Sequence, residues 1–207
     1  MKRKRAMKMN KLVMATNNAN KLREAREILS PLGLEVLSLS EIGIDCDPDE
    51  NGATFEDNAE IKARAIFNAI AEKYGENTAV FADDSGLCVD ALGGRPGVHS
   101  ARYAPKGQEC DKLLGEMDGV ADEKRTARFV CSIVYLDEAG KSITARGTCE
   151  GKIGYEQRGT NGFGYDPVFM VGDKTMAELS ADEKNAISHR GAAMRELCRL
   201  LKERYGE

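Results

Sequence analysis

The hydrophobic positions at the start of this chain alternate between short apolar runs, which are typical of strands, and helical spacing. An apolar run at 12–15 predicts a short buried strand, and residues 35–39 have the composition of a second one. Between them, Leu22, Ala25, Leu29 and Leu32 recur at helical spacing, which predicts a helix over residues 20–31. The pattern therefore begins with strand, helix and strand in succession.

A second helix is predicted to begin after Thr54. Thr54 and Asp57 fit a capping box, in which each side chain satisfies a free backbone N–H of the first helical turn. One face of this helix is then formed by Ala59, Ala63, Ile66 and Ile70. Acidic, irregular sequence at 43–53 precedes it, and an apolar strand is predicted at 78–82.

The second half of the chain predicts a long hairpin and then helices. Residues 126–136 and 142–149 alternate and are rich in β-branched residues, with a turn at 137–140 between them. Ser180 and Glu183 form another capping box before the last helical stretch. Because strands alternate with helices first and a hairpin follows, we expect an α/β fold with a mixed sheet.

Composition narrows the class of protein. The 207 residues are 42% hydrophobic and 31% charged, which suits a soluble globular protein, and we expect residues 11–207 to form a single domain. The net charge of −4 argues against nucleic acid as the main partner, and no apolar run approaches the length of a membrane span. The six cysteines form no C-x-x-C pair, which argues against a zinc or redox motif. Because the sequence shows no secretory apolar run, we expect reduced thiols in a cytoplasmic protein. Residues 1–10 are predicted to be a basic flexible tail.

A polar turn between the first strand and helix is a candidate phosphate site. It reads Thr16-Asn-Asn-Ala-Asn-Lys21. Ligands of open α/β sheets bind at the carboxyl ends of strands, and a helix N-terminus offers free N–H groups to an anion. Lys21 adds a positive charge suited to phosphate. The alternative is a polar turn in which an asparagine caps the helix.

The sequence Asp83-Asp84-Ser85-Gly86 follows an apolar strand and is a candidate metal site. We expect it to form a turn. Mg²⁺ favours one or two carboxylates together with waters and substrate phosphates, and one aspartate could accept a proton from an attacking water. A further carboxylate could come from the acidic stretch, where Glu50 lies nearest the helix start. An exposed Asx turn and a solvated acidic loop are the alternatives.

Two further segments carry candidate ligand-binding residues. The glycine-rich loop at 159–166 offers Phe163 for stacking on a base and Asp166 as a hydrogen-bond acceptor. On one unbroken helix, Lys184 and His189 would point roughly 140° apart at about 3.6 residues per turn. Their convergence requires a break, for which Ser188 could serve as a new N-cap. A strained structural loop and a surface histidine are the alternatives.

These segments, taken together and in order, resemble the inosine/xanthosine triphosphate pyrophosphatase family. The matching blocks are Thr16 to Lys21, Thr54 to Ala59, Asp83 to Leu87, Phe163 to Pro167 and Ser188 to Gly191. The segment Gly97 to Tyr103 is also similar. The resemblance extends from Lys11 over nearly the whole chain. With it we expect an elongated mixed β-sheet flanked by helices, in two lobes with a central cleft.

The resemblance implies Mg²⁺-dependent cleavage of non-standard purine nucleoside triphosphates (ITP, dITP, XTP) to monophosphate and pyrophosphate, in a cytoplasmic homodimer. It implies that Asp84 is the general base and, with Glu50, a metal ligand. The implied substrate-binding residues are Thr16, Asn17, Asn18, Ala19, Asn20, Lys21, Lys62, Ser85, Phe163, Gly164, Tyr165, Asp166, Lys184, His189 and Arg190.

Two other functions remain open from the residues alone. A regulatory nucleotide-binding module would keep the phosphate turn but would need no metal carboxylates, so Asp83, Asp84 and Glu50 favour the enzyme. A general nucleotide phosphatase would release orthophosphate, and product analysis distinguishes it from a pyrophosphatase.

Overall fold

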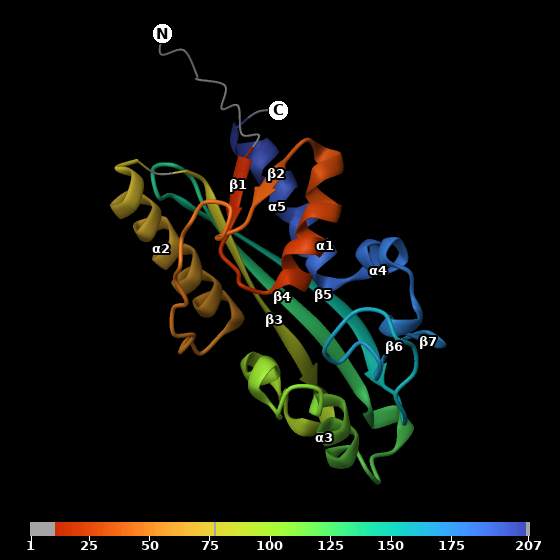
Figure 1. Ribbon diagram of the computed structural model, residues 1–207. Helices are drawn as coiled ribbons and strands as arrows, with labels where there is room; N and C mark the ends of the chain where they lie inside the picture. Colours follow the sequence, from red (N-terminus) through yellow and green to blue (C-terminus); the bar gives the residue numbers. More distant parts are fainter. Residues whose placement is uncertain (1–10, 77, 206–207) are drawn as a thin grey trace.

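The computed structural model describes residues 11–76 and 78–205, so the predicted basic tail lies outside the described residues. One mixed sheet of seven strands runs through this part of the chain in the order β2-β1-β3-β4-β5-β6-β7 (Figure 1). Strand β1 pairs in parallel with β2 and β3, and the later pairs are antiparallel. The strands are β1 (Lys11–Met14), β2 (Glu35–Leu37), β3 (Val80–Val89), β4 (Thr126–Leu136), β5 (Ser142–Ile153), β6 (Phe169–Val171) and β7 (Lys174–Thr175).

Helices flank both faces of the sheet, as the α/β prediction required. They are α1 (Ala19–Leu29), α2 (Phe55–Tyr74), α3 (Glu109–Glu116), α4 (Ala181–Ile187) and α5 (His189–Tyr205), joined by short 3₁₀ turns that include η3 (Gly97–Arg102). Figure 1 shows α2 on one side of the long strands and α1 with α5 on the other. Both predicted capping boxes are present, at Thr54 with Asp57 and at Ser180 with Glu183. None of the helices in the described ranges is long and apolar enough to cross a membrane.

The buried side chains form three clusters, and their positions define where the site can lie. Side chains on a strand alternate between the two faces of the sheet. On the face of α2, Val80 and Ala82 pack beneath that helix. On the other face, Phe81 belongs to a cluster under α1 and α5, whereas Leu87 belongs to a separate cluster near α3. Residues 83–85 of β3 therefore lie between two packed regions.

The predicted turn at Asp83-Asp84-Ser85-Gly86 is wrong, because these residues lie inside β3. Strand β4 pairs along this whole segment, with Asp83 opposite Ile133 and Asp84 opposite Ser132. Long-range pairing thus overrides local turn composition. On the other edge of β3, strand β1 pairs only as far as Phe81. Since β1 ends there, the next residues of β3 border a pocket on that edge.

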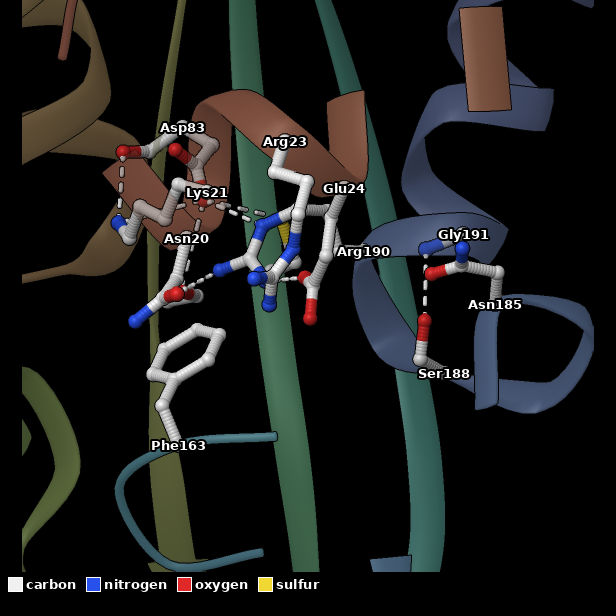
Figure 2. Close-up of polar contacts among 12 residues, drawn as sticks. Asn20, Lys21, Arg23, Glu24, Asp83, Phe163, Asn185, Ser188, Arg190 and Gly191 are labelled. Atoms are coloured by element: carbon white, nitrogen blue, oxygen red, sulfur yellow. Dashed lines mark hydrogen bonds and ion pairs between the residues drawn. The ribbon is translucent and has the colours of Figure 1, made fainter. Parts of the chain in front are cut away.

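Two local predictions about the second half are confirmed. The hairpin forms from β4 and β5, although β5 extends to Ile153. The helical stretch breaks at Ser188, whose backbone is extended with ψ 152°. The Ser188 hydroxyl accepts a hydrogen bond from the Gly191 N–H at 3.1 Å, so it caps the first turn of α5 as predicted (Figure 2).

The cysteines are all free, and they are distributed over several elements. Cys131 and Cys149 lie in neighbouring strands but are not opposite one another. Cys131 pairs in register with Gly147, and Cys149 with Phe129. The register of β4 and β5 therefore does not place these two cysteines opposite each other.

Candidate active site

A pocket of about 1010 Å³ opens beside the exposed edge of β3. Its wall contains Asp84, Glu50 and all the implied substrate-binding residues, whereas Asp83 lies outside it. These residues come from the turn at 16–21, the acidic loop, α2, β3, the glycine-rich loop and the last two helices. Segments that are far apart in the sequence thus meet at one cavity, although the block from Thr54 to Ala59 does not line it. This convergence is the geometry that the resemblance required.

Asp83 and Asp84 point to opposite faces of the sheet, because they are consecutive residues of a strand. Asp84 faces α2, where it lines the pocket. Asp83 faces α1 and α5, where it is bound by Lys21 and Arg190. The two carboxylates therefore repel each other less than they would if they lay side by side in a turn. Each carboxylate also has its own cationic partners.

Lys62 joins the two carboxylates that the sequence assigned to a metal. Its Nζ donates to Glu50 Oε2 at 3.1 Å and to Asp84 Oδ1 at 3.0 Å. Burial raises the pKa of Asp84, although the Lys62 charge opposes that change. Burial would lower the pKa of Lys62, but the Asp84 and Asp83 carboxylates raise it above its ordinary value, so Lys62 stays cationic.

The donor set suits Mg²⁺ better than a transition metal. Among the described residues there is no group of three or more His, Cys, Asp or Glu side chains that could hold a metal ion by themselves. Two carboxylates that share one cation are nevertheless present, at Glu50 and Asp84. Mg²⁺ is commonly held by one or two carboxylates with waters and substrate phosphates completing its octahedron. The residues therefore fit Mg²⁺ that arrives with a phosphate ligand.

On the α1 and α5 face, a buried network balances charges. Arg190 Nε lies 3.1 Å from Asp83 Oδ2, and Lys21 Nζ lies 3.3 Å from the same oxygen. Arg190 also donates to Glu24 and, at 2.9 Å, to the Ser85 hydroxyl. Figure 2 shows Lys21 and Arg190 converging on Asp83, with the Phe163 ring below them. Burial would raise the pKa of Asp83, but Lys21 and Arg190 hold it well below its usual range.

Lys184 links this network to the glycine-rich loop. Its Nζ lies 2.9 Å from Glu24 Oε1 and 2.7 Å from Asp166 Oδ2. Asp166 Oδ2 also accepts the Phe163 N–H at 2.7 Å, so this carboxylate fixes its own loop. The loop requires Gly162, because a Cβ there would collide with the Asp166 carboxylate. Burial raises the pKa of Asp166, and the Lys184 charge opposes the change.

The base-recognition candidates surround one side of the pocket. Lys184 Nζ lies 4.9 Å and Arg190 Cζ 5.8 Å from the Phe163 ring centroid. The His189 ring stacks on Phe129 with centroids 4.7 Å apart and planes at 11°. His189 Nδ1 is buried and has no hydrogen-bond partner among the residues that the structure describes. Because such an atom normally has a partner, it is suited to a ligand.

The phosphate turn both caps its helix and lines the pocket. Asn18 is the N-cap of α1, and its Oδ1 accepts the N–H groups of Asn20 at 3.0 Å and Lys21 at 3.2 Å. The predicted alternative of an asparagine cap is therefore correct for Asn18. It does not exclude the phosphate role, because Lys21 and the rest of the turn still face the pocket.

Sequence reasoning missed four residues at this site. Glu24 and Asn58 are buried and hold Arg190 and Asp84, respectively. The spacing from Lys21 to Glu24 and from Asn58 to Lys62 places each pair on one helix face, and this signal was available. Two basic residues of the pocket wall, Arg102 and Lys106, were also missed.

The family model described as the Ham1 family matches residues 12–200. The chain belongs to the Ham1 family. Among Ham1 relatives, the dITP/XTP pyrophosphatase of Bacillus subtilis is 48% identical over 199 residues, which cover 93% of this chain and 98% of that protein. The dITP/XTP pyrophosphatase of Clostridium perfringens is 46% identical over 200 residues, which cover 94% and 98%.

Solved Ham1 structures share this fold. The Staphylococcus aureus Ham1 protein has a TM-score of 0.80 and 39% identity, covering 94% of this chain and 99% of that one. The Ham1 protein of Coxiella burnetii gives a TM-score of 0.79 and 40% identity, with 94% and 100% covered. The open mixed sheet flanked by helices is therefore the Ham1 fold.

Proposed function

We propose that this chain is a nucleoside triphosphate pyrophosphatase that hydrolyses non-standard purine nucleotides such as dITP, ITP and XTP. The curated relatives named dITP/XTP pyrophosphatase, which match nearly the full length, support this activity. The observation that carries it structurally is that one pocket is lined by the Lys21 turn, the Asp84 carboxylate and the Phe163 loop together. Hydrolysis of these nucleotides removes them from the nucleotide pool.

Cleavage between the α- and β-phosphates requires a base and a means of neutralising the leaving pyrophosphate. Asp84 accepts the proton of the attacking water, and the raised pKa of its carboxyl favours that role. Lys21 and Lys62 supply positive charge to the phosphates. Arg102 and Lys106, on the same wall, extend this charge toward the terminal phosphates.

Mg²⁺ is the cofactor we propose, held by Glu50 and Asp84. Bound there, it would neutralise phosphate oxygens and favour expulsion of pyrophosphate. The support for this assignment is that Lys62 already bridges the two carboxylates at 3.1 and 3.0 Å, so both lie close to one cation. A bound triphosphate would compete with Glu50 and Asp84 for the Lys62 ammonium, and the two carboxylates would then be available to the metal.

The purine is recognised between Phe163 and the last two helices. The half-buried Phe163 ring offers a stacking surface. His189, whose Nδ1 is unpartnered within the described residues, is placed to meet a polar edge of the base. A site whose polar atoms pair with a 6-oxo purine leaves them unpaired with a 6-amino purine, which disfavours ATP.

A substrate screen with product identification tests this proposal. The protein is incubated with ITP, dITP, XTP, GTP and ATP in the presence of Mg²⁺, and the products are resolved by phosphorus NMR. We expect monophosphate and pyrophosphate from the first three at rates well above those for ATP. Release of orthophosphate would instead identify a phosphatase, and binding without turnover would identify a regulatory module.

We propose further that the protein acts in the cytoplasm as a homodimer. The free state of all six cysteines supports a reducing compartment. The homodimer follows from the family resemblance alone, and light scattering at micromolar concentration tests it.

A further inference from the structure

Asn58 connects the Asp84 carboxylate to the backbone of the loop that carries Glu50. Its Nδ2 donates to Asp84 Oδ2 at 3.2 Å, and its Oδ1 accepts the Gly52 N–H at 2.8 Å. The side chain is fully buried. Both ends of one amide are therefore in use, so the amide cannot rotate without breaking a buried hydrogen bond.

Gly52 brings the acidic loop close to this amide. It lies two residues after Glu50, and a Cβ at Gly52 would stand 2.5 Å from Asp57 Cβ and 2.8 Å from Asn58 Oδ1. Only glycine lets the backbone approach the first turns of α2 so closely. The position of Glu50 is consequently tied to Asn58 through the backbone of its own loop.

Asn58 and Lys62 divide the two oxygens of Asp84 between them. The two residues are four positions apart on α2, so they lie on the same helix face. Lys62 bonds Oδ1 and Asn58 bonds Oδ2. The ammonium can be drawn away by phosphate, but the neutral amide has no such competing partner. Asn58 therefore holds Oδ2 and leaves Oδ1 directed toward Glu50 and the pocket.

We propose that Asn58 is a positioning residue that sets the separation and orientation of the Glu50 and Asp84 carboxylates for a divalent cation. This inference rests on the proposed function. An asparagine suits the role because it both donates and accepts without adding charge. A leucine of similar size would do neither, and a cation there would compete with the metal.

The test measures metal binding directly. Mn²⁺ binding to the full chain is followed by electron paramagnetic resonance in the presence of an inosine triphosphate analogue with an α,β-methylene bridge. Asn58→Leu is expected to raise the half-saturating Mn²⁺ concentration by about 10- to 100-fold, the usual effect of losing a hydrogen-bond partner of a metal ligand. In turnover assays at limiting Mg²⁺, kcat of the variant should be lowered, and adding Mg²⁺ should restore part of it. The KM for ITP at saturating Mg²⁺ should stay close to the wild-type value.

Asn68→Leu is the matched control, because Asn68 is an exposed asparagine on the same helix. It should bind Mn²⁺ as wild type does. If the leucine variant does not fold, the same measurement is made on Asn58→Ser, in which the serine side chain is too short to reach Asp84. A folded Asn58 variant with wild-type Mn²⁺ binding would overturn the inference. Absence of pyrophosphate release by the wild-type protein would instead overturn the proposed function, and the two failures are thus distinguishable.

Discussion

Glu24 and Arg190 form a buried ion pair although 166 positions separate them in the sequence. The pair joins α1 to α5, and Lys184 bonds the other oxygen of Glu24. Removing one member of a buried ion pair leaves an uncompensated charge, which costs about 3–5 kcal/mol. We therefore expect Glu24→Ala to lower the free energy of unfolding by about that amount, as measured by urea denaturation. Glu27→Ala, on an exposed face of the same helix, should leave the urea midpoint near wild type.

Asp84→Asn is expected to lower kcat for ITP by a factor of about 100 to 10,000, the usual contribution of a general base. The fold should be retained, because an amide can keep one hydrogen bond from Lys62 or Asn58. Pyrophosphate release measures the effect, with Asp118→Asn as a control at an exposed aspartate. Near-normal turnover in a folded Asp84→Asn protein would remove Asp84 from the mechanism.

His189→Ala should mainly weaken discrimination by the base. Loss of one hydrogen bond to a buried ligand group costs about 1–3 kcal/mol, so the ratio of kcat/KM for ITP to that for ATP should fall by roughly 10-fold. An unchanged ratio would show that His189 does not read the base.

His189 also predicts how stability depends on pH. Burial, with the charges of Arg190 and Lys184, holds the pKa of His189 well below its usual range. As pH falls below about 6.5, the unfolded chain gains a proton at this residue and the folded protein does not. The free energy of unfolding should therefore fall by up to about 1.4 kcal/mol per pH unit from this group. His189→Asn should flatten the curve between pH 7.5 and 5.5 by that contribution (roughly one proton), as urea titrations at each pH would reveal. Parallel curves for the two proteins would contradict this explanation.

Gly147 of β5 lies against the first turn of α5. A Cβ there would collide with the backbone of His189 and Ala193. We expect Gly147→Ala to destabilise the protein by about 1–3 kcal/mol, the usual cost of overpacking, and to impair ITP turnover because His189 must shift. Gly115→Ala is the control, since a Cβ on this α3 residue meets nothing within 4 Å. Thermal melting of both variants measures the difference.

The parts of the fold that local chemistry determines could be predicted from the sequence. The capping boxes at Thr54 and Ser180 and the break at Ser188 all arise from side chains within four residues of the backbone groups that they satisfy. The β4–β5 hairpin is similarly local, because a short turn joins its strands.

The course of β3 could not be predicted in this way. Asp83 to Gly86 has the composition of a turn, and only pairing with β4, about fifty positions later, keeps it extended. The same limitation applies to Glu24 and Asn58. Helical spacing indicates that each shares a helix face with a lysine. Their partners nevertheless lie in distant elements, so the sequence does not show which charged group each one contacts.

The register of β3 on β4 has a consequence for how this site could fail. Side chains of a strand alternate with a period of two, so a slip of one residue moves each of them to the opposite face. Such a slip, from the native pairing of Asp84 with Ser132, would turn the proposed base toward Arg190 and present Asp83 to Lys62. Asp83 and Asp84 would keep their positions in the sequence, but each would lie on the face of the sheet that the other now occupies. Hydrogen bonding between two strands thereby decides which of the two aspartates is placed for the proposed role of base.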